Sequence, residues 1–424
     1  MSDSNLLIDP LPPGWNNRQF GDVCDRVKDS YQPVDDGDTP YVGLEHLAQG
    51  FPAFVGRGKE SEVKSSKTSF KAGDILFGKL RPYLRKGAQA DFEGVCSTDI
   101  LALRAKATCE SEFLKFIIHS DEFVAHAKST TSGVQHPRTS WPSLREFRLS
   151  LPPLPEQKKI AHILSTVQRV IEAQERIIQT TTELKKALMH KLFTEGLRNE
   201  PQKQTEIGPV PESWEVVELG TLFRKQPQNG IYKPKSDYGS GTQILRIDDF
   251  SNDGDVVTRA ENRVVLAHGE IENYGLEPGD IVINRVNSLS HLGKTALIGA
   301  IEDEMVFESN MMRFSVDEPQ TLKEYVFKFL NSPLTKKQIV GTAKRAVAQS
   351  SINQGDVKSI IVPKPSIEEQ GKIVEALEAT EAKIAHSTSE AAVLRDLFRT
   401  LLHELMTAKI RVHELELPTG GQAV

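Results

Sequence analysis

The chain has 424 residues, of which 38% are hydrophobic and 26% charged, and this ordinary composition excludes fibrous and wholly disordered proteins. At about 150 residues per domain, it has room for two or three domains. Lys and Arg number 52 against 58 Asp and Glu, for a formal net charge of −6. Any surface that binds a polyanion must therefore be local.

Membrane and secretion signals are missing from the sequence. No apolar run approaches the roughly 20 residues that span a bilayer, and the first residues have neither the basic nor the apolar segment of a secretion signal. The three cysteines, Cys24, Cys96 and Cys109, are too few and too far apart for a zinc ribbon or a disulfide framework. We therefore expect a cytoplasmic protein that binds no metal.

A tandem duplication organises the chain. Pro13-Gly14-Trp15 returns as Pro211 to Trp214, so the two tryptophans lie 199 residues apart. Further matches follow in the same order, and their spacing grows to 213 residues. They are Gly73 to Phe77 with Gly279 to Ile283, Glu112-Phe113-Leu114 with Glu324-Tyr325-Val326, and Glu156 to Ile160 with Glu369 to Ile373.

Each copy begins with a mixed segment. Apolar alternations predict strands at 74–77 and 100–103, and at 280–283 and 311–314 in the second copy. Short helices are expected near 112–118 and 323–330. A further strand then enters a proline cluster, which stops the strand and can preset the first turn of a helix.

After each proline cluster the apolar period becomes that of a coiled coil. The two runs are about 40 residues long, or roughly 60 Å of helix, and we expect them to pack against each other antiparallel, with one globular copy at each end. Gln174 and Ser387 share one repeat position, where they either form a polar pair that fixes the register or face solvent beside the seam. The predicted seam consists of Ile160, Leu164, Val167, Ile171, Gln174, Ile178 and Leu188 with Ile373, Leu377, Ile384, Ser387, Leu394, Phe398 and Leu401.

The predicted fold class is α+β, with two tandem mixed α/β recognition domains separated by a long antiparallel two-helix coiled coil in pseudo-twofold symmetry. The predicted parts are a first domain (1–153), a first long helix (154–196), a linker (197–210), a second domain (211–365), a second long helix (366–417) and a flexible tail (418–424).

No catalytic constellation is recognisable. Gly293-Lys294-Thr295 ends like a phosphate-binding loop, but Ser288 stands where the first glycine is required. Nucleophile elbows and metal-binding H-E-x-x-H helices do not occur. This favours a protein that binds rather than one that catalyses.

Positive charge is concentrated in the globular copies. Residues 51–90 hold nine basic against three acidic residues, and 223–246 and 335–358 each hold five against one, whereas 247–280 hold nine acidic against two basic. Such stretches can follow a phosphate backbone, and the polar side chains among them can contact base edges. The candidate DNA-binding residues are Arg57, Lys59, Lys64, Lys67, Lys79, Arg81, Tyr83, Arg85, Lys86, Gln135, His136 and Arg138 in the first copy, and Lys225, Gln228, Asn229, Tyr232, Lys233, Lys235, Arg246, Arg285, Asn287, His291, Lys294, Lys344, Arg345, Gln349 and Asn353 in the second.

This arrangement resembles the specificity subunit of type I restriction–modification systems. The motifs that carry the resemblance are the Pro-x-x-Trp opening, the Gly-Asp-Ile strand, Leu151-Pro-Pro-Leu-Pro-Glu-Gln157 before the first long helix, and Leu192-Phe-Thr-Glu-Gly-Leu197 between the halves. The first copy departs from the opening motif with Pro12-Pro13-Gly14-Trp15, and the second proline cluster is looser but keeps Glu369-Gln370.

The resemblance implies a non-catalytic subunit whose two domains each read half of a bipartite asymmetric site in double-stranded DNA, with the paired helices as a ruler. It also implies two modification subunits that bind S-adenosylmethionine and methylate adenine, and restriction subunits that act as a motor and nuclease; no cofactor is expected on this chain. The alternatives are a specificity subunit of a related multi-subunit methyltransferase, a protein-only coiled-coil adaptor, and a methyltransferase with its own recognition domain. The last would need an Asp/Asn-Pro-Pro-Tyr/Phe motif, which is missing.

Overall fold

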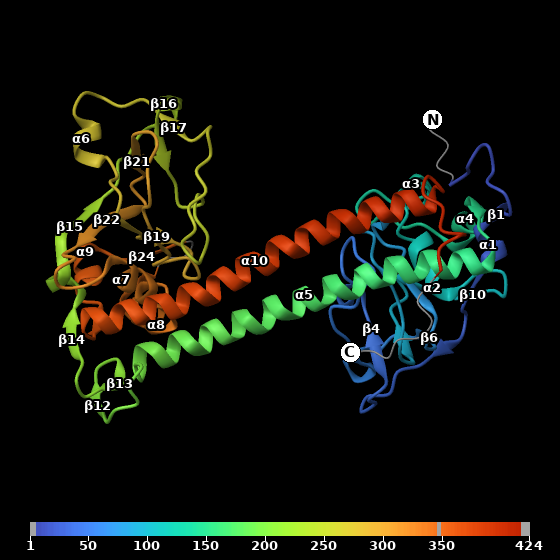
Figure 1. Ribbon diagram of the computed structural model, residues 1–424, viewed down its shortest axis with the longest axis horizontal. Coiled ribbons are helices and arrows are strands. Elements are labelled where there is room, and N and C mark those ends of the chain that lie inside the picture. The colour runs from blue at the N-terminus through green and yellow to red at the C-terminus, as the bar shows by residue number, and fades with distance from the viewer. Residues whose placement is uncertain (1–5, 346–348, 417–424) are drawn as a thin grey trace. The chain divides into compact units, whose positions relative to one another are not determined.

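The computed structural model describes residues 6–345 and 349–416. Its internal contacts divide the chain into unit 1, with residues 1–176 and 387–424, and unit 2, with residues 177–386. Two long helices, α5 (Leu154–Thr194) and α10 (Ile367–Met406), each contribute to both units (Figure 1). Each unit therefore combines one globular copy of the repeat with portions of both helices. The predicted tail at 418–424 lies outside the described residues.

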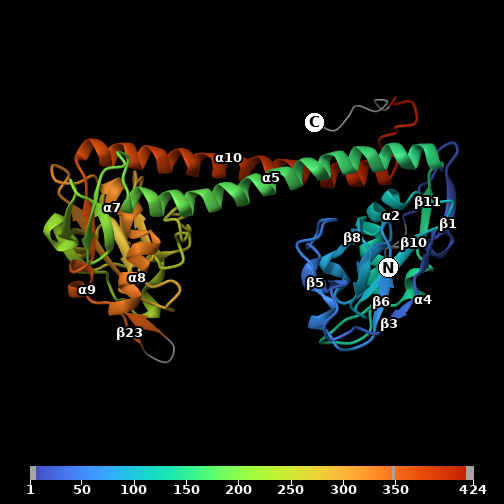
Figure 2. The ribbon, with the colours of Figure 1, turned by 90° about the horizontal axis from the view of Figure 1, so that it is seen from below.

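The two units share one sheet topology, which confirms the duplication. A four-stranded antiparallel sheet has the order β2-β10-β7-β8 in unit 1 and β15-β22-β18-β20 in unit 2. A second antiparallel pair, β1-β11 or β14-β25, joins the start of each copy to the strand before its long helix (Figure 2 shows β1 beside β11). The strands of these sheets are β1 (Asn16–Gln19), β2 (Cys24–Arg26), β7 (Ile75–Gly78), β8 (Gly87–Gln89), β10 (Ile100–Ala105) and β11 (Arg148–Leu151) in unit 1, and β14 (Glu215–Glu218), β15 (Phe223–Asn229), β18 (Ile281–Asn284), β20 (Thr295–Leu297), β22 (Met311–Val316) and β25 (Ile361–Lys364) in unit 2.

The remaining strands differ more between the units. Unit 1 has a five-stranded sheet in the order β3-β6-β9-β4-β5, and unit 2 has two three-stranded sheets, β17-β16-β21 and β19-β24-β23. A small hairpin, β12-β13, precedes the second copy. These strands are β3 (Ser30–Tyr31), β4 (Pro40–Val42), β5 (Gly58–Lys59), β6 (Lys67–Phe70), β9 (Gly94–Cys96), β12 (Gln202–Thr205), β13 (Gly208–Pro211), β16 (Tyr238–Leu245), β17 (Arg263–Val264), β19 (Val286–Asn287), β21 (Met305–Phe307), β23 (Lys344–Arg345) and β24 (Ser350–Ser351).

Short helices cover the sheets, and the two that the sequence predicts are confirmed as α2 (Ser111–Ile117) and α7 (Lys323–Leu330). Both are followed by a serine that caps the next helix, since the Ser120 and Ser332 hydroxyls accept backbone N–H bonds. The other short helices are α1 (Phe20–Val23), α3 (Asp121–Ser129), α4 (Trp141–Leu144), α6 (Glu270–Tyr274), α8 (Pro333–Thr342) and α9 (Gln354–Lys358), with 3-10 turns at Leu44–His46, Glu60–Glu62, Pro82–Leu84, Leu219–Leu222 and Lys235–Asp237.

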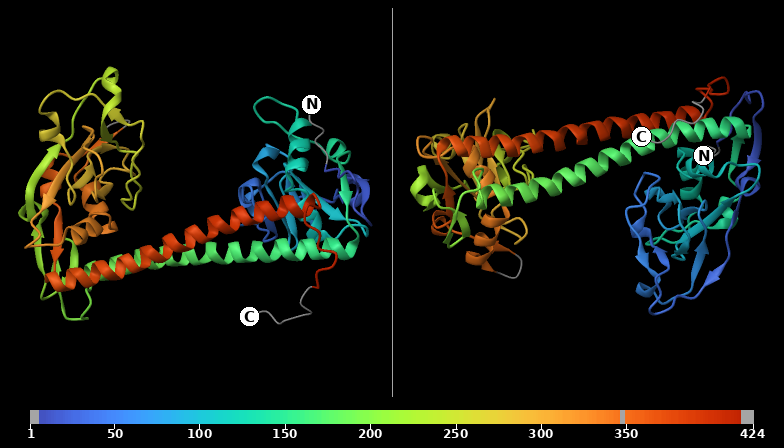
Figure 3. Two further views of the ribbon diagram at one scale, coloured as in Figure 1. Left: turned by 45° about the horizontal axis from the view of Figure 1, so that its top comes forward. Right: turned by 60° about the horizontal axis from the view of Figure 1, so that its bottom comes forward.

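Within each unit the long helices run antiparallel, side by side (Figure 3). In unit 1, Ile160 and Leu164 of α5 share a hydrophobic cluster with Leu402 and Leu405 of α10, while Glu175 pairs with Arg395. In unit 2 the end of α5 packs against the beginning of α10. The residues of the two helices that share a hydrophobic cluster there are Met189, Leu192, Phe193, Ile373, Val374 and Leu377.

Every residue of the predicted seam is buried or half-buried. The fully buried members are Ile160, Leu164, Ile171, Ile373, Leu377, Ser387 and Phe398, and the half-buried ones are Val167, Gln174, Ile178, Leu188, Ile384, Leu394 and Leu401. Gln174 Oε1 and Ser387 Oγ are both buried without a hydrogen-bond partner among the described residues. The polar pair that the sequence allows is therefore not hydrogen-bonded, and Ser387 does not face solvent.

The structure differs from the prediction at the end of the second long helix and adds detail to the linker. The second long helix ends at Met406 rather than at residue 417, because Ala408 takes a left-handed backbone (φ 55°) and the chain turns there. Val412 then joins the core of unit 1, and Arg411 pairs with Glu156 at 2.8 Å. Most of the predicted linker at 197–210 belongs to the β12-β13 hairpin.

A pair of side chains fastens each copy to its long helix. The indole Nε1 of Trp15 donates to Glu156 (2.9 Å), and that of Trp214 donates to Glu369 (3.4 Å). The adjacent glutamine accepts a hydrogen bond from the backbone N–H of the residue that precedes α2 or α7. Gln157 accepts from Glu110 and Gln370 from Leu322, both at 2.8 Å. The Pro-x-x-Trp and Glu-Gln motifs are therefore two halves of one buried joint, present once in each unit.

Candidate nucleic-acid interface

About half of the candidate DNA-binding residues have side chains held by contacts within the protein. Lys67 is buried and its Nζ donates to the Ser65 carbonyl (2.7 Å), and Arg138 forms two bonds with Asp99 (2.8 and 3.0 Å). This hydrogen bond from Arg138 is the main cause that lowers the pKa of Asp99. The candidates held in this way are Lys59, Lys67, Arg85, Lys86, Arg138, Lys225, Gln228, Lys233, Arg246, Arg285, Lys294 and Asn353.

The other candidates present exposed or half-buried side chains. They are Arg57, Lys64, Lys79, Arg81, Tyr83, Gln135, His136, Asn229, Tyr232, Lys235, Asn287, His291, Lys344 and Gln349. Tyr232 is 81% exposed and Tyr83 49%, so both rings are accessible to a ligand. Arg345 lies in β23, and its side chain is outside what the structure describes.

In unit 1, two segments far apart in the sequence meet at the surface. The loop after β7 (79–86) lies against a hairpin (132–138): Leu80 bridges to Arg138, and the Arg81 N–H donates to the Pro137 carbonyl at 2.8 Å. We call these two segments loop pair 1. The exposed and half-buried candidates on it are Lys79, Arg81, Tyr83, Gln135 and His136.

Loop pair 1 is held from beneath by its own basic side chains. Arg85 pairs with Asp121 and donates to the His119 carbonyl (3.2 Å), while Lys86 Nζ donates to the Leu44 carbonyl (2.6 Å). His119 Nε2 lies 2.9 Å from the Gly87 carbonyl, and burial lowers the pKa of His119 to about 4, so its ring is neutral near pH 7. The loop is therefore a fixed platform.

Unit 2 repeats this arrangement. The segment after β18 (285–294) pairs with residues 349–353 through Val286 with Ser351 and Asn287 with Ser350, and β24 in turn pairs with β23 (Lys344–Arg345). We call these segments loop pair 2. Its support comes from Lys336, whose Nζ donates to three carbonyls within 285–294 at 2.8 to 3.0 Å. Burial lowers the pKa of Lys336.

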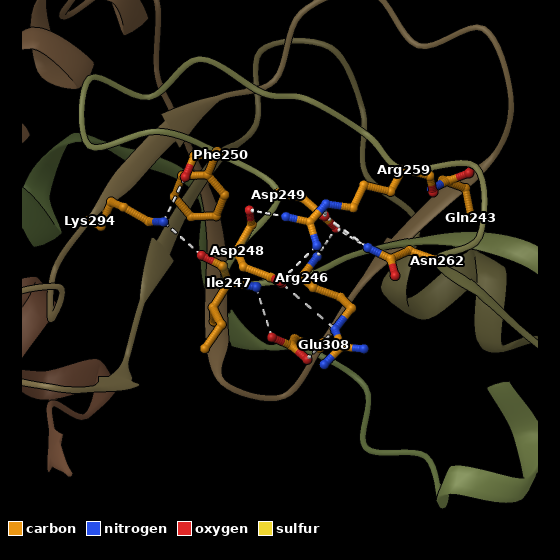
Figure 4. Close-up of polar contacts among 10 residues, drawn as sticks. All are labelled: Gln243, Arg246, Ile247, Asp248, Asp249, Phe250, Arg259, Asn262, Lys294 and Glu308. Atoms are coloured by element: carbon orange, nitrogen blue, oxygen red, sulfur yellow. Dashed lines mark hydrogen bonds and ion pairs between the residues drawn. The ribbon is translucent and has the colours of Figure 1, made fainter. Parts of the chain in front are cut away.

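The acid-rich segment of unit 2 folds around a buried carboxylate (Figure 4). Asp249 accepts from the Asn262 amide (2.8 and 2.9 Å) and from the Arg246 backbone N–H (2.9 Å). Lys294 lies over the Phe250 ring and donates to the Phe250 carbonyl at 2.7 Å; burial lowers the pKa of Lys294. The Lys294 side chain therefore holds this segment, while the Arg246 guanidinium pairs with Glu308 at 3.7 Å and stays 43% exposed. That these two residues contact DNA stays a prediction.

Sequence reasoning missed the residues that shape these surfaces. Val134, at the tip of the hairpin in loop pair 1, is 99% exposed, and the anchors Asp99, Asp121 and Lys336 were not singled out. The sequence signal was Gly133 beside Val134, because glycine is typical of tight hairpins, and in the structure Gly133 does adopt a positive φ of 91°. Within 6–345 and 349–416 there is no group of three metal-ligating side chains, and no described helix is long and apolar enough to cross a membrane.

Comparison with known proteins identifies the repeat. The family model of the type I restriction modification DNA specificity domain matches residues 12–183 and 211–394, one match for each copy. The type I restriction enzyme MjaVIII specificity subunit of Methanocaldococcus jannaschii is 26% identical over 96% of this chain and 95% of its own length. The EcoBI specificity subunit of Escherichia coli is 25% identical over 69% of this chain and 65% of its own length.

Solved structures share the fold. The crystal structure of the type I restriction–modification S subunit from M. genitalium aligns with a TM-score of 0.58 at 16% identity, covering 96% of this chain and 99% of that one. A chain from a structure of type I complex assembly and conformational transition gives the same TM-score at 20% identity, covering 94% and 99%.

Proposed function

Since the chain belongs to the family of the type I restriction modification DNA specificity domain, we propose that it is the DNA-recognition subunit of a type I complex and that each unit reads one half of a bipartite asymmetric site. The observation that carries this proposal is the recurrence, in both units, of a loop pair with exposed polar and basic side chains after the third strand of the four-stranded sheet. Phosphate contacts position such a surface on DNA and base contacts specify the sequence.

The long helices set the spacing between the half-sites in this proposal. α5 has 41 residues and α10 has 40, or roughly 60 Å each, and both contribute to the two units without interruption. Since one turn of B-DNA spans roughly 34 Å, a helix pair of this length suits half-sites in successive stretches of groove. Inserting one helical turn after Gln174 is expected to change the unread spacer and leave both half-sites unchanged.

Modification subunits supply the chemistry. We propose that two of them dock along the helices, bind S-adenosylmethionine and methylate adenine, and that restriction subunits join this assembly. Exposed apolar side chains support docking by partner helices: Val170, Ile177 and Leu184 recur every seven residues along α5, and Val393 and Leu397 are exposed on α10. The chain itself performs no reaction in this proposal.

Sequencing methylated adenines in a host with and without this gene tests the function. We expect a motif of two defined half-sites around a fixed undefined spacer, which disappears when the gene is deleted and returns with it. Methyl transfer by the purified chain alone, or an unaltered set of methylated sites after deletion, would contradict the proposal.

A further inference from the structure

Arg81 and Asn287 occupy the same place in the two copies. Each follows the last residue of β7 or β18 by three positions. Arg81 donates its backbone N–H to Pro137, and Asn287 is the register partner of Ser350. Pro137 and Ser350 in turn each lie three residues before the cap of α4 or α9. The duplicated scaffold therefore presents one side chain at this point in each unit.

The backbone at Arg81 is strained and firmly held. Arg81 and Arg85 both adopt the left-handed conformation (φ 50°) on either side of the turn Pro82–Leu84, a conformation that costs free energy for residues with a Cβ. The ion pair between the Arg85 side chain and Asp121 accounts for the conformation of Arg85. The Arg81 side chain is exposed, and its contact with the Gln135 carbonyl is long, at 3.5 Å.

The two side chains have different chemistry that suits different bases. A guanidinium donates two parallel bonds to O6 and N7 of guanine, whereas a carboxamide both donates to and accepts from adenine in the major groove. Asn287 is half-exposed, and among the described residues its Oδ1 accepts one hydrogen bond, from the N–H of the next residue, Ser288 (2.8 Å), so rotation of the side chain makes both polar atoms available.

We propose that Arg81 and Asn287 are the matched specificity-determining side chains of the two units, with Arg81 reading a guanine in one half-site and Asn287 an adenine in the other. This inference rests on the proposed function and names the residues through which it operates. The duplicated scaffold of each unit places this side chain in the major groove of the DNA, and the identity of the residue at that position determines which base is accepted.

The test uses the full chain assembled with its modification subunits and selects bound duplexes from a randomised pool, with sequencing. Arg81→Asn is the main variant because asparagine tolerates a left-handed backbone, and Arg81→Gly, which removes the strain, is the second. Asn287→Ala tests unit 2. We expect each variant to lose discrimination about 10- to 100-fold at one base pair of its own half-site only. Lys28→Ala, which removes an exposed charge from unit 1 at a position outside the candidate interface, is the control and should leave the selected sequence unchanged.

Other outcomes overturn the inference. A uniform loss of affinity at every sequence, with a shallower salt dependence, would make Arg81 a phosphate contact. Unchanged half-sites, or loss of folding in both Arg81 variants by thermal melting, would make it dispensable or structural. If the unsubstituted complex selects no bipartite sequence, the proposed function itself fails, so the two failures are distinguishable.

Discussion

One contact between the globular part and the long helices is aromatic in unit 1 and ionic in unit 2. In unit 1, Phe398 of α10 packs against Phe51 (ring centroids 5.5 Å apart) and Phe116 of α2 (6.1 Å). In unit 2 the equivalent positions hold Lys185, which lies 213 residues before Phe398, and Lys328, which lies 212 residues after Phe116.

Both lysines of unit 2 pair with one carboxylate, Glu381, and Lys185 also pairs with Asp253 at 2.7 Å. Burial alone would lower the pKa of Lys185, but the two carboxylates together raise it. The two copies thus keep the same joint at Trp15 or Trp214 while filling the neighbouring contact with different chemistry. The attachment of each globular copy to its long helix is the same in both units, whereas the neighbouring contacts differ between them.

Removing the aromatic contact should have the largest effect. Phe398→Ala deletes a side chain that is 3% exposed, and we expect the opening free energy of unit 1 to fall by about 3–5 kcal/mol. Amide hydrogen exchange read peptide by peptide measures this loss separately in each unit. The neighbour Leu397, 44% exposed, provides the control, since Leu397→Ala should change stability by less than about 0.5 kcal/mol. An equal loss of protection in unit 2 would break the comparison.

Removing the shared carboxylate should destabilise unit 2 next. Glu381→Gln removes the carboxylate shared by two nearly buried ammonium groups, so Lys328 loses its ion pair while Lys185 keeps its pair with the exposed Asp253. Because the Glu381 side chain is 28% exposed, we expect about 1–3 kcal/mol, less than for a fully buried pair. Asp253→Asn is the control, as Asp253 is 69% exposed and should matter little. Similar exchange rates in both variants would show that the Glu381 pairing has no special weight.

Acid sensitivity should distinguish the units. His119 of unit 1 is replaced at the equivalent position by Asn331, which donates to the Thr295 carbonyl at 3.2 Å. The pKa of His119 falls from 6.5 to about 4 through burial, so between these values the unfolded chain binds the proton and the folded chain does not.

The stability of unit 1 should therefore decline as pH falls from 6.5 to 4, by about 1–3 kcal/mol. His119→Asn, which installs the residue of unit 2, should remove this decline, and thermal melting with hydrogen exchange at both ends of the range checks it. An undiminished decline in the variant would assign the acid response to other groups.

The smallest effect is expected when Lys185 becomes apolar. In Lys185→Met, Glu381 keeps its pair with Lys328, and an apolar side chain resembles what unit 1 uses at this position. Replacing a buried ionic group by an apolar one of similar size is often nearly neutral, so we expect a change within about 1 kcal/mol. A loss above about 2 kcal/mol would show that unit 2 requires its ionic junction.

The sequence predicted the duplication and the main helices and strands, but not the shortest strands or the end of the second long helix. The duplication, the strands after Gly73 and Gly279 and the two long helices follow from patterns that recur in the sequence. The two-residue strands β3 and β5 escape such patterns because pairing in the sheet, and not propensity, determines them. The end of α10 depends on Ala408, a residue that favours helix locally, so tertiary contacts at Arg411 and Val412 decide it.

The candidate interface shows the same limit. A lysine in a basic stretch is ordinarily a surface residue, yet Lys67 is 6% exposed, because its ammonium group finds acceptors on Ser65 and lies over the Tyr41 ring. Composition locates the charged loops, but it does not reveal which side chains point inward to hold them. That division depends on acceptors such as Asp99 and Asp121, which lie elsewhere in the sequence.

Unit 1 is built from two stretches of chain, and this has a consequence for its biosynthesis. Residues 1–176 emerge from the ribosome well before residue 387, while unit 2 lies wholly between them. At 5–20 residues per second the delay is roughly 10 to 40 seconds, during which Phe51, Phe116 and Leu164 lack their α10 partners. The N-terminal half of the nascent chain therefore keeps part of its apolar surface uncovered during this interval, and transiently exposed apolar surface of this kind is prone to aggregation.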